Sequence, residues 1–323
     1  MKILVAGGAG YIGSCCTEYL LDRGHDVLVF DDLLTGHRDA VDPRAAFVRG
    51  NLADAPTLDS TVSSFQPEGV IHFAAFIEVG ESMRAPGKYL RNNVANGINL
   101  LESAVAHGVR KIVFSSTAAV YGMPGTIPIP ESERTAPINP YGESKLMFER
   151  MLHWYYQVHG LGYAALRYFN AAGASARFGE DHDPESHLIP IVLQVAEGTR
   201  DSISIFGTDY PTPDGTCIRD YIHVLDLAQA HLLALQSESV GSFNLGSGTG
   251  HSVRQIIDTV RDITGQQLHV VEAEPRPGDP PRLISDSTAA RTQLGWSPAY
   301  ESIHDIVSSA WKWRQGHPNG YDA

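Results

Sequence analysis

Lys2-Ile-Leu-Val-Ala-Gly7-Gly-Ala-Gly10-Tyr-Ile-Gly13 is the stretch of sequence that decides the fold. Its first five residues predict a short buried strand, and a helical pattern follows from about residue 14 to residue 23. Gly7 permits a tight turn, Gly10 lets the backbone approach a pyrophosphate, and Gly13 lets the helix pack closely. The N-terminus of that helix offers unpaired N–H groups and positive potential to phosphates. The stretch therefore predicts the first half of a dinucleotide-binding βαβ unit.

An acidic residue follows the second predicted strand. That strand covers residues 27–30 and comes after Gly24, which ends the helix as glycine does at a C-terminal cap. Asp31 stands 18 residues beyond Gly13, where a carboxylate can accept hydrogen bonds from a ribose diol. Because the same charge repels a 2′-phosphate, the sequence predicts NAD in preference to NADP.

Strands and helices continue to alternate along the N-terminal half. Further strands are predicted over residues 47–52, 69–75 and 109–116, and helical patterns separate them, including one over 88–107. Such alternation is typical of an α/β fold with a doubly wound parallel (Rossmann) sheet. Ligands bind at the C-terminal ends of the strands in these sheets. Those ends carry Asp31, Asn51, Phe73-Ala74-Ala75 and Ser115-Ser116-Thr117. His72, one residue before such an end, is interpreted as a core histidine.

The alternation loosens after residue 170, which predicts a second, smaller α/β domain. Residues 1–170 are expected to form the NAD-binding domain, and residues 171–323 the domain that binds the substrate. Within the latter, 171–185 reads as a loop, 188–198 and 253–264 as helices, and 203–206 as a strand. The chain is expected to return to the large sheet at about 219–245.

Composition and charge narrow the class of protein. The 323 residues are 43% apolar and carry a net charge of −13, which argues against a nucleic-acid or anionic-membrane surface. The three cysteines make no disulfide framework and no metal spacing, which suits the cytoplasm. Glycines interrupt the first apolar run, so it is not interpreted as a signal peptide. No stretch of 18 apolar residues occurs, so no membrane span is predicted.

Tyr141 and Lys145 are the candidate catalytic pair. They stand four residues apart in Asn-Pro-Tyr-Gly-Glu-Ser-Lys, which places them on one face of a predicted helix. A neighbouring positive charge favours the phenolate and is expected to lower the pKa of the tyrosine. A tyrosine that releases its proton near neutral pH is a general base. Thr117 ends a predicted strand on the cofactor side and completes the set.

Ordered motifs over essentially the whole chain resemble the extended, nucleotide-sugar branch of the short-chain dehydrogenase/reductase superfamily, the NAD-dependent epimerase/dehydratase family. The segments that carry the resemblance are Gly-Gly-Ala-Gly-Tyr-Ile-Gly-Ser at 7–14, Val-Ile-His-Phe-Ala-Ala at 70–75, Val-Gly-Glu-Ser at 79–82, Asn-Asn-Val at 92–94, Phe-Ser-Ser-Thr-Ala-Ala-Val-Tyr-Gly at 114–122, Asn-Pro-Tyr-Gly-Glu-Ser-Lys at 139–145, Leu-Arg-Tyr-Phe-Asn at 166–170, Asp-Tyr-Pro-Thr-Pro-Asp-Gly-Thr at 209–216, Arg-Asp-Tyr-Ile-His-Val at 219–224 and Arg-Pro-Gly-Asp at 276–279.

The resemblance implies roles for the catalytic residues. Thr117 would share a hydrogen bond with a sugar oxygen, Tyr141 would move the proton, and Lys145 would hold the nicotinamide ribose. Family members that eliminate water or carbon dioxide place acids directly after the strand-end threonine, whereas this chain has Ala118 and Ala119. Alanine cannot transfer protons. The two alanines therefore argue for hydride transfer without elimination. Within the branch, the ordered motifs resemble the 4-epimerases, and that resemblance implies interconversion of UDP-galactose and UDP-glucose through a 4-keto sugar with bound NAD.

Three alternatives stay open. The first is a 4-epimerase of UDP-N-acetylglucosamine, or one of dual specificity. The second is a non-catalytic NAD-binding protein on the same fold, although such a protein would be expected to lose Tyr141 or Lys145. The third is a net reductase or dehydratase; a reductase would require free exchange of the cofactor, and the two alanines count against a dehydratase.

The resemblance also implies which residues surround the ligands. The expected cofactor-binding residues are Gly7, Gly10, Tyr11, Ile12, Gly13, Asp31, Asp32, Leu33, Thr35, Gly36, Asn51, Leu52, Phe73, Ala74, Ala75, Ile77, Asn92, Ser115, Tyr141, Lys145, Tyr168 and Phe169. The expected substrate-binding residues are Thr117, Asn170, His187, Leu188, Ser204, Ile205, Phe206, Arg219, Arg276, Asp279 and Leu283.

Among the substrate residues, Arg219 and Arg276 are expected at the UDP pyrophosphate because a guanidinium binds phosphate through two hydrogen bonds. Asp279 is expected at a ribose hydroxyl, and residues 204–206 at uracil. Leu283 stands where some members have tyrosine, and its smaller side chain would admit an N-acetyl group.

Other departures from the family concern the cofactor and the sugar. Asn51 replaces an acid expected near adenine, and Ile77 lies where some members have a lysine, which would weaken retention of NAD. His187 stands where asparagine is common.

The segment from Asp181 to His187 is rich in acids and histidines, but its spacing fits no helical or finger pattern. It is interpreted as a solvated loop, and no metal site is predicted. Homodimerisation through helices near 88–107 and 143–159 is a further expectation from the family.

Overall fold

A seven-stranded parallel sheet forms the larger part of the molecule. The computed structural model describes residues 1–276 and 278–321. The strand order is β11-β6-β5-β4-β1-β2-β3, and every neighbouring pair is parallel. The bounds are β1 Lys2–Ala6, β2 Asp26–Asp31, β3 Ala46–Arg49, β4 Gly69–His72, β5 Lys111–Thr117, β6 Gly162–Tyr168 and β11 Gly241–Leu245. The predicted α/β fold with a doubly wound parallel sheet is confirmed.

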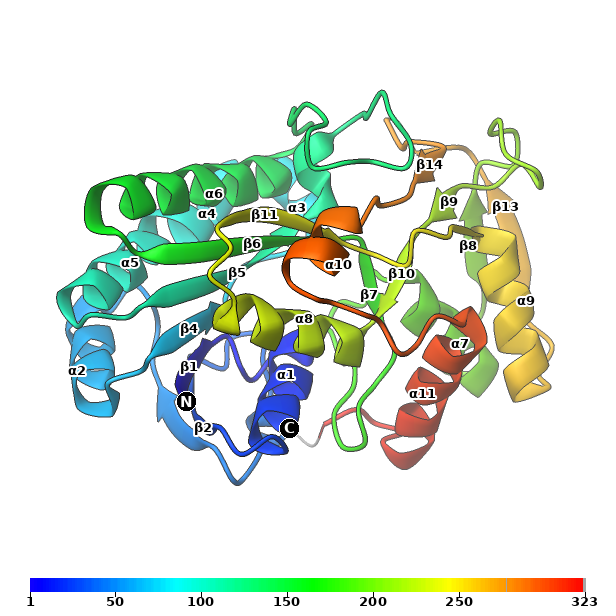
Figure 1. The fold of residues 1–323 in the computed structure, drawn as a ribbon. Coiled ribbons are helices and arrows are strands. Elements are labelled where there is room, and N and C mark those ends of the chain that lie inside the picture. The colour runs from blue at the N-terminus through cyan, green and yellow to red at the C-terminus, as the bar shows by residue number, and fades with distance from the viewer. Residues whose placement is uncertain (277, 322–323) are drawn as a thin grey trace.

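Helices cover both faces of this sheet (Figure 1). Side chains of a strand point alternately to opposite faces, so Ile3 and Val5 join one apolar core while Leu4 and Ala6 join the other. The first core is closed by α1 (Tyr11–Leu21) and α8 (Val224–Gln236). The second is closed by α2 (Ala55–Phe65), α5 (Asn96–Ala106) and α6 (Pro140–His159). His72 is buried against the rings of Phe114 and Phe148, which confirms its place in the core. Its Nδ1 has no hydrogen-bond partner within the described residues, so it is not a fully satisfied core histidine.

The C-terminal half adds small sheets and helices around a separate apolar core, seen at the right of Figure 1. Its helices are α7 (Leu188–Glu197), α9 (Val253–Thr264) and α11 (Ile303–Gly316). Its strand pairs are β7 (Asn170–Ala172) with β10 (Tyr221–His223), β8 (Ile203–Phe206) with β13 (Val270–Ala273), and β9 (Ile218–Arg219) with both β12 (His251–Ser252) and β14 (Arg282–Leu283).

The chain crosses between the two parts more than once. After β10 it runs through α8 into β11, which pairs with β6 at the edge of the large sheet. Residues of α10 (Thr288–Gln293), together with Leu294 and Trp296, also pack into the core beneath that sheet. The division of the chain into two domains, residues 1–170 and residues 171–323, therefore stays a prediction.

Several predicted element bounds are corrected. The first helix begins at Tyr11, three residues earlier than predicted, because Gly10 is its N-cap and accepts a hydrogen bond from the Ser14 N–H at 2.8 Å. The strand predicted over 69–75 ends at His72, because the N–H groups of Phe73 and Ala74 both turn to donate to the Ala6 carbonyl.

The helix predicted over 88–107 is present without a break up to Ala106, but its hydrogen-bonding pattern changes along its length. It consists of α4 (Pro86–Tyr89), a π-helical segment over Leu90–Ala95, and α5. Such π-helical turns are uncommon and are often found beside functional sites. In the described residues, no helix is both long and apolar enough to cross a membrane.

Candidate active site

The glycine-rich turn between β1 and α1 forms a cradle whose shape depends on two of its glycines. Gly7 adopts φ +84°, and a Cβ there would lie 2.4 Å from the Ala74 nitrogen. A Cβ on Gly13 would lie 2.2 Å from the Gly7 carbonyl oxygen, so α1 packs directly onto the turn. A Cβ on Gly10 would meet only the Gly7 oxygen at 3.7 Å, an ordinary contact. The folded protein therefore needs glycine at 7 and 13 but not at 10, which leaves Gly10 open for a ligand to approach closely.

The start of α1 is also available to a phosphate group. Among the described residues, no side chain caps this helix, so the first-turn N–H groups keep their positive potential. These features fit the pyrophosphate of a dinucleotide.

Asp31 holds the two loops that border this cradle. Its carboxylate accepts hydrogen bonds from the N–H groups of Ala9 at 3.0 Å and Leu33 at 2.9 Å. Burial raises the pKa of Asp31, and the two backbone hydrogen bonds partly oppose this shift. Asp32 accepts a hydrogen bond from the Asn51 amide at 2.5 Å. This hydrogen bond joins the segments that follow β2 and β3, whose C-terminal ends were predicted to lie at the same edge of the sheet.

The three catalytic candidates meet where β5 ends and α6 begins. Thr117 is the last residue of β5. Helix α6 begins at Pro140 because the Asn139 side chain caps it, accepting a hydrogen bond from the Gly142 N–H at 2.8 Å. Tyr141 and Lys145 therefore lie in its first two turns, and the Lys145 Nζ is 5.9 Å from the centre of the Tyr141 ring.

Close packing brings α6 against the segment after Thr117. A Cβ on Gly142 would lie 2.7 Å from the Ala119 carbonyl oxygen. The N–H of Ala119 donates to the Thr117 Oγ1 at 3.1 Å. Only small side chains, those of Ala118 and Ala119, follow Thr117 here, and neither can transfer a proton.

The protonation of the pair differs from the sequence-based expectation. Burial raises the pKa of Tyr141 to about 12, although a hydrogen bond with Thr117 acts to lower it. Burial also lowers the pKa of Lys145 to about 7, against the opposing charge of Glu149. The expectation that the lysine charge lowers the tyrosine pKa is therefore wrong for the protein without cofactor. A lysine that is only 1% exposed and half deprotonated at neutral pH exerts little charge on its neighbour.

Two supporting groups were missed by sequence reasoning. Asn93, in the π-helical segment, exchanges hydrogen bonds with the backbone of Phe76 and donates to the Ser144 Oγ at 3.0 Å. It thus ties the segment after β4 to the catalytic helix. The second group is the buried ion pair of Arg167 on β6 with Glu149 on α6, whose closest contact is 2.5 Å. The signal available in the sequence was a polar residue inside the apolar pattern of a helix. This signal does not identify the partners of Asn93 and Glu149, because those partners lie on other elements of the chain.

Four of the predicted substrate residues come together in the C-terminal half. Arg219 of β9 forms an ion pair with Asp279, and the Arg276 guanidinium lies 4.1 Å from the centre of the Phe206 ring. Phe206 is exposed at the end of β8. A guanidinium stacked on an exposed aromatic ring, beside a second arginine, is a suitable surface for a nucleoside diphosphate.

Other predicted residues lie in the interior. The side chains of Ile205 and Tyr168 are buried in the apolar cores, so they can face a ligand only through their backbone or, for Tyr168, its hydroxyl, which lies 3.2 Å from the His231 Nε2. Asn170 donates to the Asp220 carbonyl at 2.9 Å. Leu283 is half-buried on β14 and packs on the small core of Val120, Tyr121, Ile129 and Leu146.

The acid- and histidine-rich segment is a partly exposed loop, as expected, but its acids and histidines contact one another. His187 does not stand alone, because its Nδ1 lies 2.8 Å from a Glu180 oxygen and 3.1 Å from a Glu185 oxygen. Glu180 itself is buried, and His182 also faces it. These contacts were not predicted because the sequence interpretation considered spacing along the chain, whereas the loop folds back on itself.

Comparison with known proteins identifies the family of the chain. The model of the NAD dependent epimerase/dehydratase family matches residues 3–246. A UDP-glucose 4-epimerase of Halalkalibacterium halodurans is 52% identical over 327 residues, which cover 99% of this chain and 98% of the relative. A crystal structure of a UDP-glucose 4-epimerase has a TM-score of 0.97 at 49% identity and full coverage of both chains. The enzyme of Brucella ovis in complex with NAD has a TM-score of 0.94 at 45% identity, covering 96% and 97% of the two chains. The chain therefore belongs to the NAD dependent epimerase/dehydratase family.

Proposed function

We propose that this protein interconverts UDP-galactose and UDP-glucose as an NAD-dependent isomerase, a UDP-hexose 4-epimerase. The observation that carries the proposal is the burial of Tyr141 and Lys145 beside Thr117, with Ala118 and Ala119 where an elimination would need acids. The full-length relatives and solved neighbours bear the name of the same activity.

The residues of this chain perform the proton transfers. Thr117 Oγ1 shares a hydrogen bond with the sugar 4-oxygen, and Tyr141 takes the 4-hydroxyl proton. When bound, NAD+ supplies the hydride acceptor and a positive charge that favours the Tyr141 phenolate. Lys145, which donates to the Ser115 carbonyl at 2.7 Å, lies where it can also hold the nicotinamide ribose.

The sugar must turn over between the two halves of the reaction. Loss of the 4-hydroxyl proton to Tyr141 and of hydride from C4 to the cofactor would leave a 4-keto sugar. This sugar would rotate about its bond to the pyrophosphate and present its other face, and it would then regain the hydride from the reduced cofactor and the proton from Tyr141. The nucleotide has to stay anchored meanwhile, which separates binding from the reacting carbon. Arg219, Arg276 and Phe206 supply that anchor in our proposal, and Asp279 can exchange its ion pair with Arg219 for a ribose hydroxyl.

One assay tests the function. Purified protein is incubated with UDP-galactose without added NAD, and UDP-glucose is measured by chromatography. Conversion without added cofactor is expected because the reaction regenerates NAD. Failure to convert UDP-galactose, with and without added NAD, together with failure on UDP-N-acetylgalactosamine, would overturn the proposal.

A second substrate pair, UDP-N-acetylglucosamine and UDP-N-acetylgalactosamine, is favoured by one observation. Leu283 is a medium-sized, half-buried side chain at the position expected to gate the sugar pocket. Its size leaves more room beside C2 than a tyrosine would. Parallel assays with both sugar pairs measure the preference directly.

We also propose that the protein acts as a homodimer in the cytoplasm. Trp154 and Val158 on α6 are 65% and 68% exposed, and Ile98 on α5 is 41% exposed. An apolar face of this kind is typical of a subunit interface. Cys15, Cys16 and Cys217 are free thiols, which suits a reducing compartment. Light scattering gives the mass in solution, and Trp154→Glu should shift it to that of one chain; an unchanged mass would exclude this face.

A further inference from the structure

Four potential metal ligands converge in the loop between β7 and α7. This His–Glu cluster consists of Glu180, His182, Glu185 and His187, and one donor atom from each lies within 4.8 Å of all the others. Both imidazoles present the Nδ1 atom to the two carboxylates. The separations are 2.8 and 3.1 Å for His187, and 3.3 and 3.8 Å for His182.

These separations match the edges of a small coordination sphere. Zn²⁺ binds histidine nitrogen and carboxylate oxygen at about 2.0–2.2 Å, so neighbouring ligands of a tetrahedral ion lie about 3.3–3.5 Å apart. The four measured values bracket that length. Hydrogen bonds account for part of the cluster, since Glu185 Oε1 accepts from the N–H groups of Ser186 and His187, each at 2.8 Å, and lies 3.1 Å from the His187 Nδ1. They do not account for the His182 Nδ1, which has no hydrogen-bond partner within the described part of the chain.

The cluster also requires positive charge. The Glu180 and Glu185 side chains are only 7% and 5% exposed, and within residues 1–276 and 278–321 neither forms an ion pair with lysine or arginine. Without a metal, only the two histidines among the described residues lie within ion-pair distance of these carboxylates. A metal binds neutral imidazoles, and with neutral imidazoles the two carboxylates carry a charge of −2, which one divalent cation neutralises.

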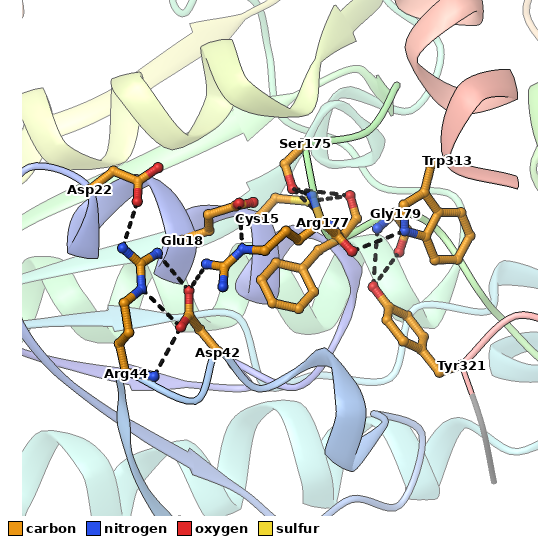
Figure 2. Close-up of polar contacts among 11 residues, drawn as sticks. Cys15, Glu18, Asp22, Asp42, Arg44, Ser175, Arg177, Gly179, Trp313 and Tyr321 are labelled. Carbon is orange, nitrogen blue, oxygen red and sulfur yellow. Dashed lines mark hydrogen bonds and ion pairs between the residues drawn. The ribbon is translucent and has the colours of Figure 1, made fainter. Parts of the chain in front are cut away.

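The surrounding structure holds the loop in place before any ion binds. Figure 2 shows the preceding segment, where Arg177 forms ion pairs with Glu18 of α1 and with Asp42. The Gly179 N–H donates to the Tyr321 hydroxyl at 3.0 Å, and the Trp313 indole donates to the Arg177 carbonyl at 3.2 Å. On the other side the cluster runs directly into α7, because His187 is the N-cap residue of that helix. Rigid flanks of this kind favour a preformed site.

We propose that Glu180, His182, Glu185 and His187 bind one divalent transition-metal ion with Zn²⁺ preferred, as a structural site joining the start of α7 to the cofactor cradle. The link to the cradle is Tyr11, whose ring meets the His182 ring edge-on at 6.3 Å between centres and whose hydroxyl donates to the Gly173 carbonyl at 2.6 Å. Two imidazoles and two carboxylates suit Zn²⁺ better than Mg²⁺ or Ca²⁺, which prefer all-oxygen sites. The inference does not depend on the proposed function, and it assigns His187 to the metal instead of the sugar.

The wild-type protein provides the first test. Protein expressed without a histidine tag is stripped with a chelator, dialysed, and titrated with Zn²⁺ in competition with a chromophoric chelator. One equivalent per chain is expected, and Co²⁺ should give the visible absorption of a four-coordinate ion. X-ray absorption of the zinc form should show two nitrogen and two oxygen ligands. Absence of stoichiometric binding, or a six-coordinate Co²⁺ spectrum, would overturn the proposal, and neither measurement needs a variant.

Substitutions then locate the ion. Glu180→Gln and His182→Gln should each weaken Zn²⁺ binding by more than about 100-fold, since even outer partners of metal ligands contribute 10–100-fold. His304→Gln removes an exposed histidine of α11 and serves as the matched control with unchanged binding. Equal affinity in the cluster variants and the control would show that the ion binds elsewhere and would refute the assignment.

Discussion

The catalytic pair and the His–Glu cluster are both at least half-buried, yet the pKa values of Lys145 and His187 shift in opposite directions. Lys145 has its pKa lowered to about 7 by burial. In the cluster, burial acts in the same sense to lower the pKa of His187, but Glu180 and Glu185 outweigh it and the pKa is raised well above its ordinary value. Burial acts to lower the pKa of both groups, so burial alone does not explain the difference.

What differs is the availability of an opposite charge. The carboxylate whose charge acts on the catalytic lysine is Glu149, and both of its oxygens are engaged by Arg167, at 2.9 and 2.5 Å. Lys145 is left with a neutral carbonyl partner at Ser115. Buried charges are tolerated only where a partner compensates the lost hydration. The reactive site thus stays ready for a charged ligand, whereas the cluster compensates its own charges.

The largest expected effect comes from Tyr141→Phe. Loss of the proton-transferring hydroxyl should lower kcat by about 10³-fold, within the range known for general acid–base groups. The amount of NAD that copurifies should be unchanged, because the ring remains. Epimerase assays and release of bound NAD by acid measure the two quantities.

Tyr156→Phe on the same helix is the matched control, because this tyrosine is partly exposed and lies outside the site. Full activity in the Tyr141 variant would show that another group moves the proton.

Lys145→Met tests the uncompensated charge directly in cofactor-free protein. Below pH 7 the lysine is protonated in both the folded and the unfolded chain, so the stability of the wild type is lowered by the whole free-energy cost of burying this charge. Between pH 7 and 10.5 only the unfolded chain holds the proton, so wild-type stability rises with pH. The stability of the variant relative to wild type should therefore fall by about 2 kcal/mol between pH 7 and pH 9.

Urea unfolding at these two pH values gives the difference. The unpaired Ser115 carbonyl left by the substitution destabilises the variant equally at both, so the pH dependence is the informative result. Lys312→Met, at an exposed position of α11, should show no such trend. A constant difference between Lys145→Met and wild type would mean that the lysine keeps its ordinary pKa.

Substitution of two glycines of the cradle distinguishes the requirements of the fold from the requirements of NAD binding. Gly13→Ala should destabilise the fold by about 1–3 kcal/mol, as overpacking does, because the new Cβ would meet the Gly7 carbonyl. Gly10→Ala should destabilise it by less than about 1 kcal/mol, the usual range for an N-cap change, but should reduce bound NAD. Thermal unfolding measures the stability of each variant, and the amount of copurified NAD measures cofactor binding. If Gly10→Ala retained as much NAD as the wild type, the pyrophosphate would have to bind elsewhere.

The smallest effect is expected at the sugar pocket, where neither charge nor backbone is involved. Leu283→Tyr should lower kcat/KM for UDP-N-acetylglucosamine about 10-fold relative to UDP-glucose, since pocket size alone discriminates weakly. Competition assays with both sugars give the ratio. An unchanged ratio would remove Leu283 from the pocket wall.

Elements defined by local pattern were predicted closely. The strands Lys2–Ala6 and Ile203–Phe206 and the helix Val253–Thr264 have the predicted bounds. Their apolar periodicity and flanking residues are contained in a few consecutive positions. The π-helical segment was missed, because Asn93 is held there by Phe76 and Ser144, which lie far away in sequence.

The sequence by itself determined the alternation of strands and helices, the glycine-rich turn and the four-residue spacing of Tyr141 and Lys145, all of which follow from local geometry. Only the tertiary structure decided the charge state of Lys145, because Arg167 on another strand engages Glu149. It alone also brought Glu180 and Glu185 around the two histidines. The physical reason is that a pKa or a ligand set depends on burial and on contacts between distant segments, and neither is encoded in residue spacing.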